Sequence, residues 1–295
     1  MTEDLGSVIE KGVETWKKNL SICLPFVFST ILTFVVAIII IGSAILVAFP
    51  SLLSLIPYLT KPDEIPPYLI SPLLPQFLQS IGIIAAAVIL AIILGLLIHA
   101  FFSAGAIGMA KEAAEKGRAS LSDMTDYGRR KFISLLFADI IVGFIALAGV
   151  VFVIPGVLYI LPYITTLSET PPEVVFTAIA IVGSGFMVMC IYLVLVSILF
   201  ALTRYAVVID DLGAVEGVKK GFNFFMAHKL NVFLLWLIVL AIGMVAGFIL
   251  GSIPYIGQPV SMVVSVIVIQ PLTVIWWSRL YLSLPEREPA EPFVV

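Results

Sequence analysis

The sequence predicts an all-α polytopic membrane protein with six transmembrane helices and three cytoplasmic amphipathic interfacial helices. Hydrophobic residues make up 61% of the 295 residues and charged residues 12%, with a mean hydropathy of +1.17, whereas soluble proteins carry about 25% charged residues. Six apolar runs reach the length of about 20 residues that a spanning helix needs. A short basic motif precedes an apolar run at three places, which indicates a weak threefold hairpin repeat.

The motif is a glycine followed four residues later by an aromatic residue, with lysine or arginine nearby. The three pairs are Gly12 and Trp16, Gly128 and Phe132, and Gly221 and Phe225. We interpret each unit as a basic surface helix, a spanning helix, an outer loop and a returning spanning helix. The units are predicted at about 5–110, 120–203 and 211–284, within one membrane domain of residues 1–284.

The first unit opens with an amphipathic stretch at residues 5–20. Its apolar residues fall on one helical face and its charged residues on the other, as in helices that lie in a membrane interface. Pro25 marks a kink where the chain enters the membrane. The six predicted spans cover approximately residues 21–49, 81–109, 132–159, 174–203, 231–252 and 260–280.

The segments between the spans divide into two kinds. Residues 50–80, 161–173 and 253–259 are rich in proline and poor in positive charge, and we predict them to be outer loops. The connectors 111–131 and 204–230 are charged. The tail, residues 285–295, is polar and proline-rich and is predicted to be disordered.

The distribution of lysine and arginine predicts the orientation. With both termini in the cytoplasm, fifteen of the sixteen basic residues lie inside and only Lys61 lies outside. Because cytoplasmic segments are enriched in these residues, this positive-inside pattern predicts a multi-pass protein of the cell membrane with cytoplasmic N- and C-termini. The predicted interfacial anchors are the aromatic residues Trp16, Phe132, Phe225, Trp276 and Trp277.

Three stretches resemble a known group of proteins: RYAVVIDDLGAVEGVKKGFNFF, AKEAAEKGRASLSDMTDYGRRKF and VVSVIVIQPLTVIWWSRLYLSL. They are similar to uncharacterised six-span membrane proteins related to the membrane domain of glycerophosphoryl diester phosphodiesterases. The resemblance implies an all-helical, six-span fold with cytoplasmic surface helices. It implies no catalytic residues, because in the fused members the chemistry belongs to a separate soluble domain.

The sequence offers few groups for catalysis. His99 and His228 are its two histidines, there is no HExxH motif, and Ser184 lacks the first glycine of a GxSG motif. Cys23 and Cys190 lie in apolar runs, where a packing thiol is expected. We therefore predict a protein that is not an enzyme, with no metal, no cofactor and no nucleic-acid partner.

His99 and Asp139 are the candidate intramembrane polar site. An aspartate at the centre of a spanning helix costs about 2.5–3.5 kcal/mol on insertion scales, so its presence asks for a partner. Both residues are expected about 12–18 Å from the cytoplasmic ends of their helices, where they could meet. They would serve either a proton- or cation-linked site or a hydrogen bond between packed helices. Gln270, just before Pro271, is a third polar point at a predicted break in the sixth span.

Gly243, Gly247 and Gly251 recur every four residues on the fifth span, as in a glycine zipper. This spacing lets another helix approach closely. We expect packing within the chain, with a homo-oligomer through the fifth span as the alternative.

These features favour a non-enzymatic integral membrane protein with an accessory or scaffolding role in the cell envelope, related to lipid, with membrane lipids as its partners. The alternative is a small proton- or cation-linked transporter or channel that uses His99 and Asp139.

Overall fold

The computed structural model describes residues 4–50, 58, 73–163 and 171–284, and these residues form helices and no strand. Six of the helical segments are long and apolar enough to cross a membrane, as predicted. The predicted tail and most of the first outer loop lie outside the described residues.

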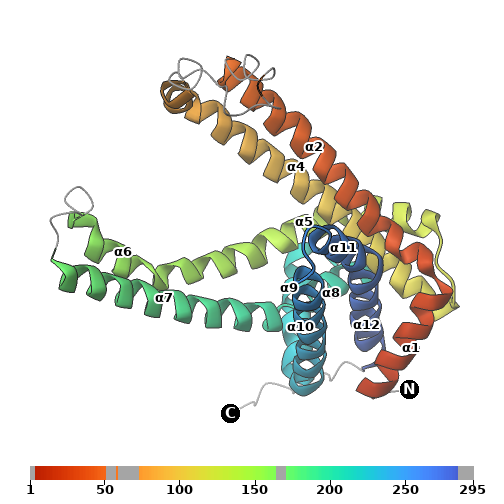
Figure 1. The fold of residues 1–295 in the computed structure, drawn as a ribbon. Coiled ribbons are helices and arrows are strands. Elements are labelled where there is room, and N and C mark those ends of the chain that lie inside the picture. Colours follow the sequence, from red (N-terminus) through yellow and green to blue (C-terminus); the bar gives the residue numbers. More distant parts are fainter. Residues whose placement is uncertain (1–3, 51–57, 59–72, 164–170, 285–295) are drawn as a thin grey trace, which may run out of the picture.

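Three helical hairpins leave a common base and diverge from it (Figure 1). The first arm consists of α2 (Leu24–Ala48) and the 44-residue α4 (Leu73–Lys116). The second arm runs out through α5 (Leu121–Leu147) and α6 (Ile154–Ile160) and returns through α7 (Pro172–Leu199). The third hairpin pairs α10 (Lys229–Gly251) with α11 (Gly257–Val264) and α12 (Gln270–Ser283).

The base is completed by three short helices, α1 (Leu5–Lys18), α8 (Thr203–Ile209) and α9 (Ala214–Ala227). The main hydrophobic cluster lies here and draws residues from all three hairpins. Its members include Val8 of α1, Ile107 of α4, Leu135 of α5, Val207 of α8 and Leu280 of α12. The core of the protein therefore holds the base together, while the arms extend away from it.

Two of the three predicted surface helices are separate helices. A short 3-10 turn (Leu20–Cys23) separates α1 from α2, and Pro25 stands in the first turn of α2, where the kink was predicted. His228 separates α9 from α10. The prediction of a separate middle surface helix is wrong. Helix α5 continues unbroken from Leu121 into the third span, because no proline interrupts it near Gly128 and Phe132.

Other boundaries also differ from the prediction. Helix α4 begins at Leu73, inside the predicted first outer loop, and continues to Lys116, inside the predicted connector. The third span is divided after Leu147 by a 3-10 segment (Ala148–Phe152), and Pro155 stands in the first turn of α6. In the sixth span a π-helical turn (Ser265–Ile269) precedes Pro271, so the predicted break takes the form of a π-bulge.

The three motif glycines lie where helices cross. Gly12 faces the ring of Trp276 in α12, and a Cβ at Gly128 would lie 2.9 Å from the ring of Phe101 in α4. A Cβ at Gly221 would lie 2.7 Å from the backbone of Thr203 in α8. Gly12 and Gly128 thus face the returning helices of other hairpins, and Gly221 faces α8, the short helix that follows α7. That the three units are repeats of one another stays a prediction.

Candidate functional site: an ion pair where the two arms meet

Asp139 of α5 and Arg204 of α8 form an ion pair where the two arms join the base. The Nε of Arg204 donates a hydrogen bond to Oδ1 of Asp139 over 2.8 Å. The aspartate side chain is 19% exposed and the arginine side chain 44%. Arg204 directly follows the fourth apolar run, and the chain turns there so that its long side chain reaches back toward the third span.

Within the described part of the chain, Arg204 is bonded through Nε alone, and its terminal nitrogens Nη1 and Nη2 make no hydrogen bond. Arginine carries five N–H donors on a planar group, and only one is used by Asp139. The pair therefore keeps free donors that a carboxylate or phosphate could accept from.

His99 of α4 lies beside this pair but does not hold Asp139. Its Nε2 is 3.3 Å from Oγ of Ser103, one helical turn further on, and the imidazole is exposed. The imidazole is close enough to Asp139 and Arg204 for electrostatic interaction with both charges. The hydrogen bond that was one of the two alternatives for His99 and Asp139 does not form: His99 pairs with Ser103, and Oδ1 of Asp139 accepts from Arg204.

Gln270 does not join these residues. Its Nε2 donates to Oγ of Ser265 over 3.2 Å, across the π-helical turn in the same span. The polar side chain of Gln270 is therefore satisfied by a hydrogen bond within its own span, next to Pro271.

The predicted close contact at the glycines of α10 is also wrong within this chain. A Cβ at Gly243 or Gly247 would meet nothing within 4 Å, and one at Gly251 would lie 3.8 Å from the side chain of Gln258. The physical reason is the divergence of the hairpin, because α10 is buried near its start, at Val232 and Leu235, and then leaves the core. The homo-oligomer through this face stays a prediction.

Among the predicted interfacial anchors, Trp276 and Trp277 are core residues instead. They are 4% and 5% exposed, and the indole of Trp276 donates to the carbonyl of Ile9 over 3.1 Å. Trp276 faces inward because α1 covers it, and the ring of Trp277 lies against Tyr205 of α8, with 6.4 Å between the ring centroids.

The other three predicted anchors are less buried. The indole of Trp16 donates to the carbonyl of Ile267 over 3.3 Å, Phe132 packs on Phe101, and Phe225 packs on the main cluster. Their position at a membrane interface stays a prediction.

A second polar centre fixes the turn between α8 and α9. Lys111 donates to the carbonyl of Ile209 over 2.9 Å, and Lys131 donates to the carbonyl of Leu212 over 3.2 Å and pairs with Asp211 at 2.8 Å. Asp211 has a left-handed backbone (φ 60°). The hydrogen bond from Lys131 lowers the pKa of the Asp211 carboxyl, since it favours the charged form.

Asp210, the preceding residue, pairs with Lys220 at 2.8 Å and accepts a hydrogen bond from the hydroxyl of Tyr281. Lysines from α4, α5 and α9, together with Tyr281 of α12, thus connect these helices to the turn that carries two adjacent carboxylates. This arrangement has an evident structural use, because each of these cations holds a carboxylate or a carbonyl.

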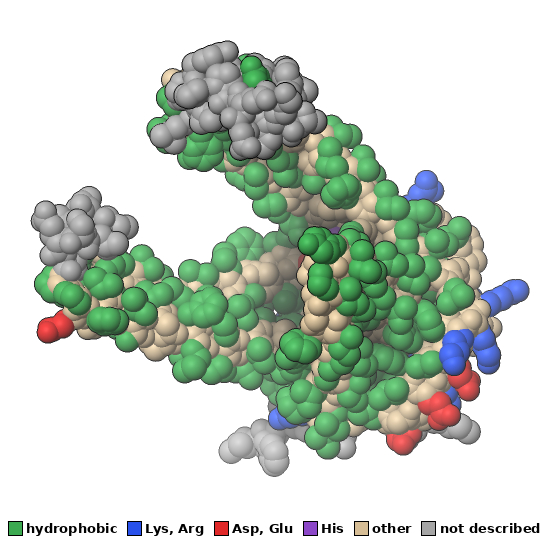
Figure 2. Space-filling view, viewed as in Figure 1, with side chains coloured by type: hydrophobic (Ala, Val, Ile, Leu, Met, Phe, Trp, Pro, Cys, Tyr) green, Lys and Arg blue, Asp and Glu red, His purple; other side chains and the backbone are tan. Residues whose placement is uncertain are grey.

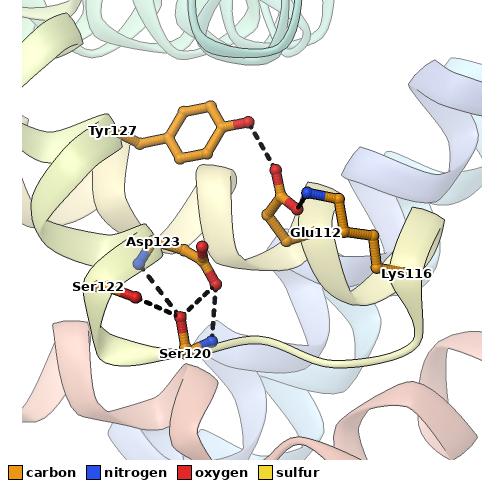
Figure 3. A network of polar contacts seen from close by, with 6 residues as sticks. All are labelled: Glu112, Lys116, Ser120, Ser122, Asp123 and Tyr127. Atoms are coloured by element: carbon orange, nitrogen blue, oxygen red, sulfur yellow. Dashed lines mark hydrogen bonds and ion pairs between the residues drawn. The ribbon is translucent and has the colours of Figure 1, made fainter.

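A third polar network closes the turn between α4 and α5 (Figure 3). The buried Glu112 accepts a hydrogen bond from the hydroxyl of Tyr127 at 3.0 Å and pairs with Lys116 at 2.5 Å. Ser120 and Asp123 cap the start of α5 reciprocally, through their side chains and backbone N–H groups. Like the second centre, this network is satisfied internally.

In the described residues, no group of three His, Cys, Asp or Glu side chains is placed to hold a metal ion. The Asp139 and Arg204 pair, with His99 beside it, keeps free hydrogen-bonding capacity next to the arms. The free N–H groups of Arg204 can bind an anionic group.

The fold and this site define a polytopic helical membrane protein whose polar groups gather at one end of its apolar arms. Residues 31–280 match the family described as "Domain of unknown function (DUF7847)", and the chain belongs to that family. It is 25% identical over 290 residues to an "Uncharacterized protein" of Archaeoglobus fulgidus, which covers 95% of this chain and 96% of that relative. No solved structure matches the chain. The expected relation to glycerophosphoryl diester phosphodiesterases stays a prediction.

Proposed function

We propose that this chain is a non-enzymatic integral membrane protein with an accessory or scaffolding role in the cell envelope, and that this role is related to membrane lipid. The observation that carries this proposal is how little of its apolar surface the chain covers itself. In the most apolar part of each of the first two spans 6% of the residues are buried, against 28% in the sixth. Surface of this kind needs lipid or protein neighbours, and the divergent arms are suited to hold them.

A transporter or channel for protons or cations is the second candidate, because His99, Asp139 and Arg204 come together. The ion pair between Asp139 and Arg204 supports the accessory role instead, since the carboxylate that would carry the proton or cation already has a partner.

Ion flux in liposomes distinguishes the two candidates. The full chain would be reconstituted with a pH-sensitive dye inside, and a potassium gradient with valinomycin would drive protons inward. We expect the rate to equal that of protein-free liposomes, and Asp139→Asn to match the wild type. A wild-type rate well above both the empty liposomes and Asp139→Asn would replace the accessory role with transport.

We also propose that the base faces the cytoplasm, with both termini, and that the ends of the hairpins face outward. The positive-inside pattern supports this orientation. In a background lacking Cys23 and Cys190, Tyr255→Cys should be labelled by an impermeant maleimide from outside intact cells, because Tyr255 is fully exposed in the turn of the third hairpin. Arg118→Cys, exposed in the turn before α5, should react only after the cells are opened. Labelling of Arg118→Cys in intact cells, with Tyr255→Cys labelled only in opened cells, would show that the protein has the opposite orientation.

A further inference from the structure

The hollow between the first and second arms is the feature that the proposed function leaves without an occupant. Figure 2 shows this hollow as an open space with hydrophobic side chains on both walls, and a small area in the histidine colour at its closed end. Most of the basic and acidic side chains seen in this view lie around the base, and one acidic group lies at the far end of the second arm.

The site described above lies at this closed end. His99 belongs to α4, a helix of the first arm, and Asp139 belongs to α5, a helix of the second. Arg204 follows α7, the returning helix of the second arm, and it is 44% exposed while the rest of α8 is buried.

The hollow cannot stand empty in a bilayer. If the arms span the membrane, the space between them lies at the depth of the hydrocarbon, where no water is present to fill it. Because the side chains on both walls are hydrophobic, an apolar molecule would fit between them. The closed end, with the free N–H donors of Arg204, calls for an anion that can accept two hydrogen bonds from one guanidinium, as a phosphate does. A molecule with both properties is a phospholipid.

We propose that the hollow holds a phospholipid with an anionic headgroup, whose phosphate accepts hydrogen bonds from Nη1 and Nη2 of Arg204 and whose acyl chains lie between the arms. Asp139 orients the guanidinium through Nε and leaves the terminal nitrogens for the lipid. Since Asp139 also offsets the positive charge of Arg204, it lowers the affinity for an anion. This assignment rests on the proposed role in handling lipid and specifies its ligand.

Native mass spectrometry of the full chain in detergent tests the proposal, with phosphatidylglycerol and phosphatidylcholine of matched acyl chains as the two probes. The quantity measured is the ratio of their dissociation constants for the first lipid bound. We expect the wild type to prefer phosphatidylglycerol, and Arg204→Gln to reduce that preference about tenfold, the size expected for the loss of a charge-assisted hydrogen bond. Asp139→Asn should change the preference in the opposite direction, because it removes the competing carboxylate.

Arg129→Gln is the matched control, since Arg129 is an exposed arginine near the start of α5, and it should leave the ratio unchanged. If Arg204→Gln does not fold, the double variant Arg204→Gln with Asp139→Asn removes both charges together and should also lose the preference. Wild-type preference in either of these Arg204 variants would overturn the proposal.

Two further outcomes would also overturn it. A dimer mass without bound lipid would assign the hollow to a second copy of the chain. Displacement of the lipid by millimolar glycerol phosphate would indicate a site for a free phosphate. The liposome experiment on the same preparations distinguishes the two proposals. If the wild type shows neither a preference for phosphatidylglycerol nor proton flux, the proposed lipid site is wrong and the proposed accessory role still stands.

Discussion

Trp276→Ala is expected to lower the free energy of unfolding by about 3–5 kcal/mol, the usual cost of truncating a buried aromatic side chain. Trp276 is 4% exposed, its ring covers Gly12, and its indole N–H binds the carbonyl of Ile9. Alanine would therefore open a cavity between α12 and α1 and remove the hydrogen bond to the carbonyl of Ile9. The loss can be measured as a shift in the SDS titration midpoint of the protein in mixed micelles.

Trp276→Phe is the matched variant, because it keeps most of the ring and removes the N–H donor. It should cost about 1 kcal/mol, in the range of a single hydrogen bond. Limited proteolysis should also cut near α1 faster in Trp276→Ala. A change of only a few tenths of a kcal/mol in Trp276→Ala would mean that the side chain lies at the membrane interface, as predicted from the sequence.

Gly221→Ala is expected to destabilise the base by about 1–3 kcal/mol, the range for overpacking a tight contact. The added methyl group would lie 2.7 Å from both N and Cα of Thr203, and backbone atoms cannot rotate away as a side chain can. Helices α8 and α9 would have to separate. The same detergent titration measures this effect.

Gly247→Ala is the control and should have the opposite sign. A methyl group there meets nothing within 4 Å, so the substitution should be neutral or stabilise the helix by about 0.5–1 kcal/mol through its better helix propensity. Equal destabilisation by both variants would contradict the assignment of Gly221 to a crossing and Gly247 to a free face.

The sequence predicts the six spans well, because length and hydropathy are properties of each segment alone. It does not predict that the arms diverge. In a membrane, a helix face that packs on lipid and one that packs on another helix are both apolar, so the pattern of Gly243, Gly247 and Gly251 reads the same in either case. Trp276 and Trp277 were misplaced for a related reason, since tryptophan near the end of a span suits both an interface and a core.

The candidate site was predicted in part. The depth of Asp139 and His99 in their helices follows from the distance to the basic ends, and the structure does bring them to neighbouring helices. The partner of Asp139 was missed because Arg204 stands beyond the fourth apolar run and was counted with the connector. Its position one residue into α8, with a side chain long enough to reach the third span, was the available signal.

The contact between α1 and α12 has a consequence for biosynthesis. The hydrogen bond from Trp276 to Ile9 joins residues 267 positions apart, so α1 is made first and receives its partner last. During synthesis Gly12 and its neighbours stay uncovered until nearly the whole chain has left the ribosome, whereas the crossings at Gly128 and Gly221 form between helices that follow closely in sequence. Closure of the base is therefore a late, long-range step, and the slow stage of maturation is expected to be the docking of the first helix onto the last.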